Sequence, residues 1–545
     1  MTSFFERPGK TLIAVLIFYT LFLLVESGSW GVIETSEARY AEISRAMYSS
    51  GDWIHPRLMG IQHFHKPPVT YWITAIGYSI FGTNAFGARF FLCVSFLIQL
   101  ILVYKISGHL FEDLKVGLLS AIVYSSLPIV LTSVRGLTTD SFLNSFILGS
   151  IASWLYWRVK GKPFWLYLVA LCLGLAFLTK GPVALLIPVL FFIGFNRLFY
   201  PEKSGVYHHY ILASISFVVV ALGWFIFLVA EDRSFLNYFF FRHTVERLTE
   251  AKVFVRTQPF WYYFAFAPLL AIPWIVPLVK TLFIQTASRK SVTAKRIVIV
   301  WIVLPFIFFS LSSSKLVLYI LPLYSGLALL IGYWIRQWPE KLASLSVMSI
   351  QVFMVILSIA FFLLPIFYPV VSISLVGRIL VIGGVMAFIL FSRKSAGDAI
   401  GKLLLSSIML NAILIIISVM VFTGNELMVN STRPLTMWMQ ENSLADRQII
   451  VYNRLVPSLA FNLQKDIISV HDGNRNLDRE VQFEKNEQWR KTLFLLDKVE
   501  DRQRLEAVLE KPSVLVYKGT IKPTSIWLTR NFSHQKRFDE WVILY

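Results

Sequence analysis

The stretch from Glu34 to Trp72 is crowded with charge in an otherwise apolar chain. Its ionisable side chains include Glu34, Glu37, Arg39, Glu42, Arg45, Asp52, Arg57, His63, His65 and Lys66. Ionisable groups beside hydrocarbon are costly to desolvate and tend to mark a working site. Carboxylates can serve as a general base, and Lys or Arg can bind phosphate. This loop is therefore the first place where we expect chemistry.

Two carboxylates of the loop, Glu34 and Glu37, are the first candidates for catalysis because they lie where the chain leaves its first apolar segment. Arg39 lies between the loop's glutamates and is a candidate for substrate binding. Helical spacing over 37–48 predicts an amphipathic helix on the membrane surface. The alternative for most of its charges is a solvated face. Its apolar stripe consists of Tyr40, Ile43, Ala46 and Met47.

The loop ends in His65-Lys66-Pro67-Pro68. Two consecutive prolines restrict the backbone and stop a helix, so they can present Lys66 from a stiff platform to a phosphate. The alternative is a lysine that extends toward water from the end of a helix.

Two further candidates flank apolar runs. Asp140 begins a run in Gly136-Leu-Thr-Thr-Asp-Ser-Phe-Leu143, where an N-terminal cap would also explain it. Lys180 lies between two runs in Leu178-Thr-Lys-Gly-Pro182, which predicts a sharp turn with the ammonium group at the outer rim.

The remaining candidates lie later in the chain. Lys315 and Tyr319 are expected within one helical turn of each other, after the turn Ser312-Ser-Ser-Lys315. The loop 230–259 holds Arg242, His243, Arg247 and Arg256. His65 and His243 could supply ligands to a divalent metal ion, although two unspaced histidines are a weak signal. Acids and dispersed cations on one membrane face suit a phosphate-bearing lipid. The sequence has no P-loop, GxGxxG or Ser/His pair that would favour other chemistry.

The composition predicts a membrane protein to position these groups. The 545 residues are 56% hydrophobic and only 15% charged, with a mean hydropathy of +0.63. The net charge of +19 does not imply nucleic acid, because the Lys and Arg residues are scattered through short loops. Cys93 and Cys172 lie in apolar runs and form no disulfide framework. The first apolar run is expected to be a retained span.

About thirteen windows are long enough to cross hydrocarbon, which predicts an all-α polytopic protein. They lie near 10–26, 86–107, 114–133, 138–158, 164–179, 180–196, 209–229, 260–284, 296–312, 315–335, 345–368, 374–392 and 402–424. Lys and Arg in alternate loops define the cytoplasmic face. The opposite, extracytoplasmic face then carries nearly every carboxylate of the membrane portion and the tail.

The chain is predicted to have two domains. Residues 1–425 form the membrane domain, with outer loops 26–85 and 230–259. Residues 426–545 are polar and form a small soluble α/β domain, with strands predicted at 448–452 and 513–517 and a helix around 499–510.

These segments resemble the GT-C membrane glycosyltransferases, specifically the 4-amino-4-deoxy-L-arabinose lipid A transferase family and its protein O-mannosyltransferase relatives. The resemblance is spread over nearly the whole chain. It is carried by EARYAEISRAM, SGDWIHPRL, HKPPVTYW, FGARF, LTTDSFL, LTKGP, FFFRHTVERL, RTQPFWYY, FSLSSSKLVLYILPLY and VPSLAFNL.

The resemblance implies an inverting transfer of a sugar from an undecaprenyl-phosphate carrier to lipid A or another outer-face acceptor, without a nucleotide. It implies a monomer in the bacterial inner membrane, among membrane lipids, with the active site and tail on the periplasmic side. In family terms Asp140 is the second-loop acid and Tyr319 lines the donor cavity. Lys66 and Lys180 contact the donor phosphate, and His243 belongs to a metal site.

Two positions depart from the family pattern. Ser36 stands where the family has its first-loop acid, so Glu34 or Glu37 must substitute for it. His65 replaces the glutamate of a Glu-Lys-Pro motif, which keeps a metal ligand plausible.

The working hypothesis places Glu34 or Glu37, with Asp140, beside the acceptor, while cations stabilise the departing polyprenyl phosphate. Lys66, Lys180 and Arg256 are the cations expected to do so, and Lys315 and Arg39 are further substrate-binding candidates. The alternatives are an O-mannosyltransferase-like enzyme acting on protein or glycan, and a lipid-linked sugar transporter or flippase. A transporter would more typically show repeated halves, which this sequence lacks.

Overall fold

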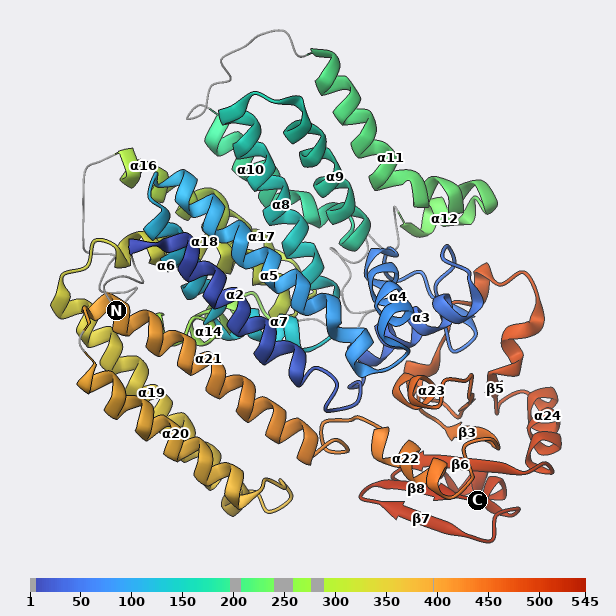
Figure 1. The fold of residues 1–545 in the computed structure, drawn as a ribbon. Helices are drawn as coiled ribbons and strands as arrows, with labels where there is room; N and C mark the ends of the chain where they lie inside the picture. Colours follow the sequence, from blue (N-terminus) through green and yellow to red (C-terminus); the bar gives the residue numbers. More distant parts are fainter. Residues whose placement is uncertain (1–5, 197–206, 240–257, 276–288, 396) are drawn as a thin grey trace. The chain divides into compact units, whose positions relative to one another are not determined.

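The computed structural model describes residues 6–196, 207–239, 258–275, 289–395 and 397–545 (Figure 1). By contacts between residues the chain divides into two compact units. Unit 1 consists of Met1–Glu26, Leu92–Arg135 and Thr139–Val421. Unit 2 consists of Ser27–Phe91, Gly136–Thr138 and Phe422–Tyr545, so the first charged loop belongs to the same unit as the tail.

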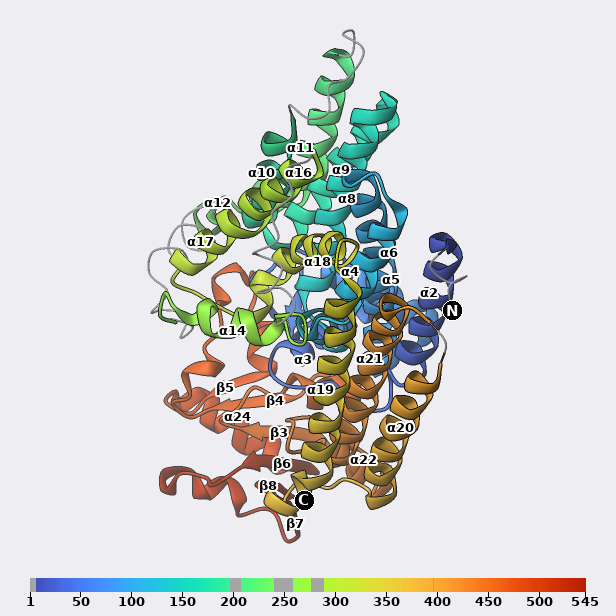
Figure 2. The same cartoon turned by 90° about the vertical axis from the view of Figure 1, so that its left-hand side faces the viewer.

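Unit 1 is helical. Its described elements are α2 (Pro8–Val25), most of α5 (Ala85–Leu110), α6 (Leu114–Ser125), α7 (Pro128–Arg135), α8 (Thr139–Lys160), α9 (Pro163–Lys180), η1 (Pro182–Leu185), α10 (Leu186–Phe195), α11 (Tyr207–Glu231), α12 (Ser234–Asn237), α14 (Tyr262–Leu270), α16 (Arg289–Arg296), η5 (Ile297–Val303), α17 (Leu304–Leu311), η6 (Val317–Ile320), α18 (Leu321–Ile335), α19 (Glu340–Phe367), α20 (Leu375–Lys394) and α21 (Ala399–Gly424). Helices α19 and α20 pack along each other, as both views show (Figures 1 and 2).

The predicted multi-span helical architecture is confirmed, but the count of thirteen spans is not. Within the described ranges nine helices are long and apolar enough to cross a membrane. The number is ten if α6 and α7, bent by 63°, form one span. The predicted window 180–196 is a 3-10 turn followed by the ten-residue helix α10, and the window 260–284 is described only in part.

A buried polar network holds α8, the helix that begins next to Asp140. Gln99 of α5 donates from Nε2 to the carbonyl oxygen of Ser141 at 2.8 Å. Tyr124 of α6 donates to Gln99 Oε1 at 2.5 Å and accepts from Asn144 Nδ2 at 2.8 Å. Because unpaired polar groups are costly away from water, these bonds fix how α8 packs in the bundle.

Unit 2 contains a six-stranded sheet of order β5-β4-β3-β6-β8-β7. Strands β3 (Gln448–Tyr452), β4 (Ile468–His471), β5 (Leu493–Leu495) and β6 (Ser513–Lys518) are parallel, while β8 (Trp541–Leu544) pairs antiparallel with β6 and β7 (Gln535–Phe538). The strands predicted near 448–452 and 513–517 are confirmed, as is the helix near 499–510, which is α24 (Val499–Leu509).

Both faces of the sheet are covered, which is typical of parallel strands. Ile449 and Val451 of β3 pack into one apolar cluster, and Ile450 and Tyr452 pack into another with α24. The first cluster includes side chains of α3 (Ser36–Ser50), α4 (Val69–Phe81), α22 (Arg433–Glu441) and α23 (Pro457–Leu463).

The expected surface helix is present as α3, but its apolar stripe does not face a membrane. Ile43 and Met47 are buried in the cluster that covers the sheet. An amphipathic helix needs one apolar contact, and here the tail supplies it. Sequence periodicity reports the stripe and not its partner.

The rest of unit 2 is short elements. The hairpin of β1 (Arg57–Leu58) and β2 (Ile61–Gln62) follows α3, and the tail adds η7 (Arg475–Leu477), η8 (Val481–Phe483), η9 (Glu487–Lys491) and η10 (Pro523–Thr529). Gly31 joins the loop to the tail, because its backbone N–H donates to Glu426 Oε2 at 3.0 Å. A Cβ at Gly31 would lie 2.8 Å from the Cβ of Arg433, so only glycine fits there.

Candidate functional site

The Glu37 carboxylate forms an ion pair in unit 2 and also accepts hydrogen bonds from the backbone. It accepts from Arg89 Nε at 2.8 Å and Arg89 Nη2 at 2.9 Å. It also accepts from the backbone N–H groups of Ile33 and Leu137, at 2.9 Å and 3.0 Å. Each carboxylate oxygen thus has two donors, an arrangement that suits a structural role better than proton transfer.

Arg89 completes this arrangement and is buried. Its remaining three N–H groups donate to the carbonyl oxygens of Ser27, Trp30 and Gly31, each at 2.9 Å. Its guanidinium also lies 4.5 Å from the ring centroid of Trp30. Arg89 and Glu37 therefore fix the backbone that directly precedes Glu34.

Glu34 has a different environment from Glu37. Its Oε1 accepts from the backbone N–H of Ser458, at the start of α23, at 2.7 Å. Its Oε2 is buried and has no hydrogen-bond partner in the described structure. Burial raises the pKa of Glu34 to about 7, against the lowering effects of Ser458 and the Arg39 charge. A carboxylate with that pKa and one unsatisfied oxygen is suited to proton transfer.

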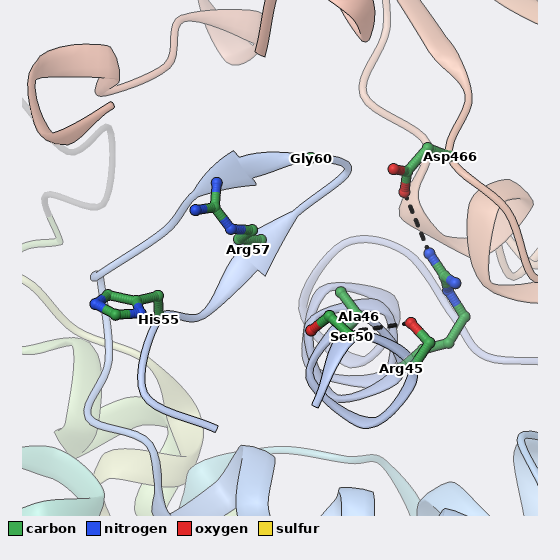
Figure 3. A pocket seen from close by; sticks show the side chains of 8 residues that line it. Arg45, Ala46, Ser50, His55, Arg57, Gly60 and Asp466 are labelled. Atoms are coloured by element: carbon green, nitrogen blue, oxygen red, sulfur yellow. Dashed lines mark hydrogen bonds and ion pairs between the residues drawn. The ribbon is translucent and has the colours of Figure 1, made fainter. Parts of the chain in front are cut away.

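A separate polar pocket lies beside the C-terminal half of α3 (Figure 3). Its volume is about 210 Å³, and its lining includes Arg45, Arg57 and Asp466. Arg45 donates to both carboxylate oxygens of Glu42 at 2.7 Å and lies 3.3 Å from Asp466 Oδ1. Arg57 Nη1 lies 3.4 Å from Glu484. Both arginines of this pocket thus have carboxylate partners within unit 2.

The His65–Lys66 segment contacts the tail within unit 2. His65 Nε2 lies 3.7 Å from Glu480 Oε2, and the His65 ring stacks on that of His63 at 4.1 Å. Lys66 is half-buried.

The predicted metal has no cluster of ligands to support it. Among the residues with described positions, no group of three or more His, Cys, Asp and Glu side chains could hold a metal ion. His243 lies outside the described residues. The metal therefore stays a prediction, and we derive no step from it.

Unit 1 brings three of the predicted residues together. Asp140, in the first turn of α8, forms an ion pair with Lys180, the last residue of α9. Both side chains are about nine-tenths buried, at 11% and 9% exposure. Lys180 Nζ lies 4.2 Å from the ring centroid of Tyr319 in η6. An acid at a helix N-terminus and a cation at a helix C-terminus are each favoured by the helix dipole, which explains their placement.

Lys315 is buried and serves the local backbone. Its Nζ donates to the carbonyl oxygens of Ser312 at 2.5 Å and Gln258 at 3.0 Å. Burial lowers its pKa. This geometry supports a loop-closing role for Lys315 more directly than the predicted contact with substrate. Arg256, the other predicted cation of this region, lies outside the described residues.

Comparison with known sequences finds relatives of one kind. The family model described as dolichyl-phosphate-mannose-protein mannosyltransferase matches residues 10–239. A curated undecaprenyl phosphate-alpha-4-amino-4-deoxy-L-arabinose arabinosyl transferase of Sodalis glossinidius (strain morsitans) is 32% identical over 353 residues, which cover 62% of this chain and 61% of that protein. A similarly named transferase of Proteus mirabilis (strain HI4320) is 30% identical over 333 residues, covering 60% and 59%. The matched region thus spans about three fifths of the length of these relatives.

Comparison with solved structures covers nearly the whole chain. The crystal structure of ArnT from Cupriavidus metallidurans bound to undecaprenyl phosphate superimposes with a TM-score of 0.77 over 98% of both chains, at 18% identity. The apo form of that ArnT gives a TM-score of 0.75 over the same shares. The chain has the fold of ArnT. The resemblance to GT-C transferases of the ArnT type, predicted from the sequence, is confirmed.

On this ArnT fold, sequence reasoning missed several residues. Arg89 and Ser458 lie in FGARF and VPSLAFNL, stretches that carried the resemblance, but neither received a role. A single arginine beside an apolar run is the signal that could have identified Arg89 as the partner of a loop acid.

Proposed function

We propose that the chain is a polyprenyl-phosphate-sugar-dependent glycosyltransferase. It transfers a sugar to an acceptor on the extracytoplasmic face of the membrane that it spans. The observation that carries this proposal is the buried Asp140–Lys180 pair beside Tyr319, on a chain with the ArnT fold. A buried cation at the rim of an apolar bundle is suited to a lipid phosphate.

The proposed reaction is a single displacement with inversion. An acceptor oxygen attacks the anomeric carbon, the bond from that carbon to the phosphate oxygen breaks, and polyprenyl phosphate leaves with the electron pair. A hydroxyl acceptor loses its proton to a general base, for which Glu34 is the candidate because the pKa of Glu34 is about 7. An acceptor phosphate is already anionic, and Glu34 would then orient groups.

Lys180 is the proposed stabiliser of the leaving phosphate. Its charge is oriented by Asp140 and by the Tyr319 ring, so it needs little reorganisation during the reaction. Lys66 is proposed as a second phosphate contact. Phosphate becomes a good leaving group once cations neutralise its growing charge, so positioning and electrostatics would supply most of the catalysis.

The finer assignment we propose is 4-amino-4-deoxy-L-arabinose as the sugar, undecaprenyl phosphate as the carrier and lipid A as the acceptor. The names of the curated relatives support the sugar and carrier. The family model matched over residues 10–239 supports mannosyl transfer to protein as the second candidate.

We propose the extracytoplasmic face for Asp140, Lys180 and the tail. Lys and Arg in the alternate loops support this orientation through the positive-inside bias.

Mass spectrometry of lipid A and surface glycans, from cells with and without this chain, tests the proposal. An aminopentose on lipid A that appears only in cells with the chain supports the finer assignment. A chain-dependent hexose on protein would favour the second candidate. Unchanged lipid A, glycans and proteins would contradict both.

A further inference from the structure

We propose that the guanidinium of Arg479, in the tail, is an anion-binding group that takes a phosphate of the sugar acceptor. The assignment to an acceptor rests on the proposed function, while the anion site itself stands on the geometry of unit 2. The residue lies in the tail between η7 and η8.

The guanidinium of Arg479 is fixed but unsatisfied. Its Nη1 donates to the carbonyl oxygens of Asn476 at 3.3 Å and Asp478 at 3.2 Å. Its Nη2 is buried and has no hydrogen-bond partner in the part of the chain that the structure describes. A buried donor without an acceptor costs stability, so such a group indicates a partner that binds there.

Two other arginines of unit 2 differ from Arg479 because each has a carboxylate partner. Arg89 and Arg45 each bind a carboxylate through two nitrogens. Arg479 has no carboxylate within ion-pair distance among the described residues. The buried Nη2 of Arg479 therefore lacks the acceptor that a carboxylate provides to those two arginines, and an anion from outside the fold could supply it.

The segment that carries Arg479 packs against the candidate site. Phe483 makes an edge contact with Phe64, with ring centroids 5.4 Å apart, and Glu480 lies 3.7 Å from His65. Both partners lie directly before Lys66. The Arg479 guanidinium is thus held beside a loop already proposed to contact phosphate.

The local electrostatics agree with an anion site. Burial, with the neighbouring charge of Arg39, lowers the pKa of Arg479 to about 10 against the raising effect of the Asp478 carboxylate, so the guanidinium stays charged at pH 7. Arg39 also acts electrostatically on Glu34. An oxyanion between two guanidiniums would relieve their repulsion, and guanidinium matches phosphate geometry.

The first test is kinetic, on the purified full-length chain. Arg479→Gln should raise KM for the acceptor about tenfold, the change expected when one charge-assisted hydrogen bond is lost. KM for the donor should stay unchanged. Arg475→Gln is the matched control, since Arg475 is exposed on the same segment. Arg479→Lys should recover part of the affinity. An unchanged acceptor KM would overturn the acceptor assignment.

The second test does not depend on transferase activity. Inorganic phosphate, added at constant ionic strength, should raise Tm of the wild-type chain and of Arg475→Gln, but not of Arg479→Gln. Lipid A should raise Tm more than its dephosphorylated form does. If inorganic phosphate raises Tm but lipid A does not, the bound anion is a free phosphate and the assignment to the acceptor is wrong. Equal stabilisation of all three chains would show that Arg479 does not bind the anion.

A purely structural role for Arg479 predicts another pattern. Replacing a structural arginine lowers Tm in the absence of any anion and weakens donor and acceptor kinetics together. Replacing an unpaired buried cation should leave that Tm unchanged or raise it. A lowered Tm with parallel losses in both KM values would therefore contradict the proposal.

Discussion

At the scale of single residues, two glutamates three positions apart have opposite environments. Glu37 is saturated by Arg89 and two backbone N–H groups, whereas Glu34 has one buried oxygen without a partner in the described structure. Sequence alone left both as substitutes for the first-loop acid. The difference depends on Arg89 and Ser458, which are distant in sequence and could not be assigned as partners from spacing.

Glu37→Gln should destabilise the protein. The substitution leaves Arg89 buried without its carboxylate, and breaking a buried ion pair typically costs about 3–5 kcal/mol. Thermal unfolding in detergent measures the effect as a lowered Tm. Glu34→Gln is the matched control and should keep Tm near the wild-type value, because the amide oxygen can still accept from the Ser458 N–H. Equal stability of the two variants would contradict the structural role of Glu37.

Transfer to a hydroxyl acceptor should depend on pH through Glu34, the proposed general base. The pKa of Glu34 is raised to about 7, so its charged fraction, and with it the rate, should rise with pH through about 7 and level off about one pH unit higher. The stability contribution has the opposite sign. The folded chain keeps a proton that the unfolded chain releases, so this group lowers stability as pH rises from about 4 to about 7.

Initial rates of transfer between pH 5.5 and 8.5 test this dependence. Glu34→Gln should lower the rate strongly and remove the rise. A wild-type rate that is flat over this range, or a variant that keeps the same profile, would show that Glu34 does not titrate in the reaction.

At the scale of elements, periodicity predicted which segments are helices and strands but not what covers them. The α3 helix, the tail strands and the helix α24 lie near their predicted positions. The partner of α3 depends on contacts between residues hundreds of positions apart, such as those of α3 with α23, and one-dimensional patterns carry no such information. Counting apolar windows likewise could not separate the short helix α10 from a full span.

Met47→Ala should destabilise unit 2. Met47 is buried in the cluster that covers the sheet, and removing such a side chain from a core costs about 2–5 kcal/mol. Tyr48→Ala is the control, because Tyr48 is 41% exposed and its loss should cost about 0.5 kcal/mol or less. Chemical denaturation of the purified chain compares the two. A helix whose stripe faced lipid would instead tolerate Met47→Ala in detergent.

At the scale of the whole molecule, the ArnT fold places the predicted residues in two structural units, and each unit contributes its own set. Unit 1 holds Asp140, Lys180 and Tyr319 together. Unit 2 holds Glu34, Arg39 and Lys66, with Arg479 added by the structure.

The most direct measurement follows the donor itself. Purified chain, a polyprenyl-phosphate sugar and lipid A are mixed in detergent, and free polyprenyl phosphate and glycosylated lipid A are quantified by mass spectrometry. The proposed transferase reaction predicts equal amounts of both products from the wild-type chain. Asp140→Asn and Lys180→Gln should each reduce them by about a hundredfold or more. Because each change also breaks a buried ion pair and lowers Tm, the rates are compared at a temperature at which both variants are still folded. Wild-type rates from both folded variants, or no release of polyprenyl phosphate by the wild-type chain with any acceptor, would contradict it.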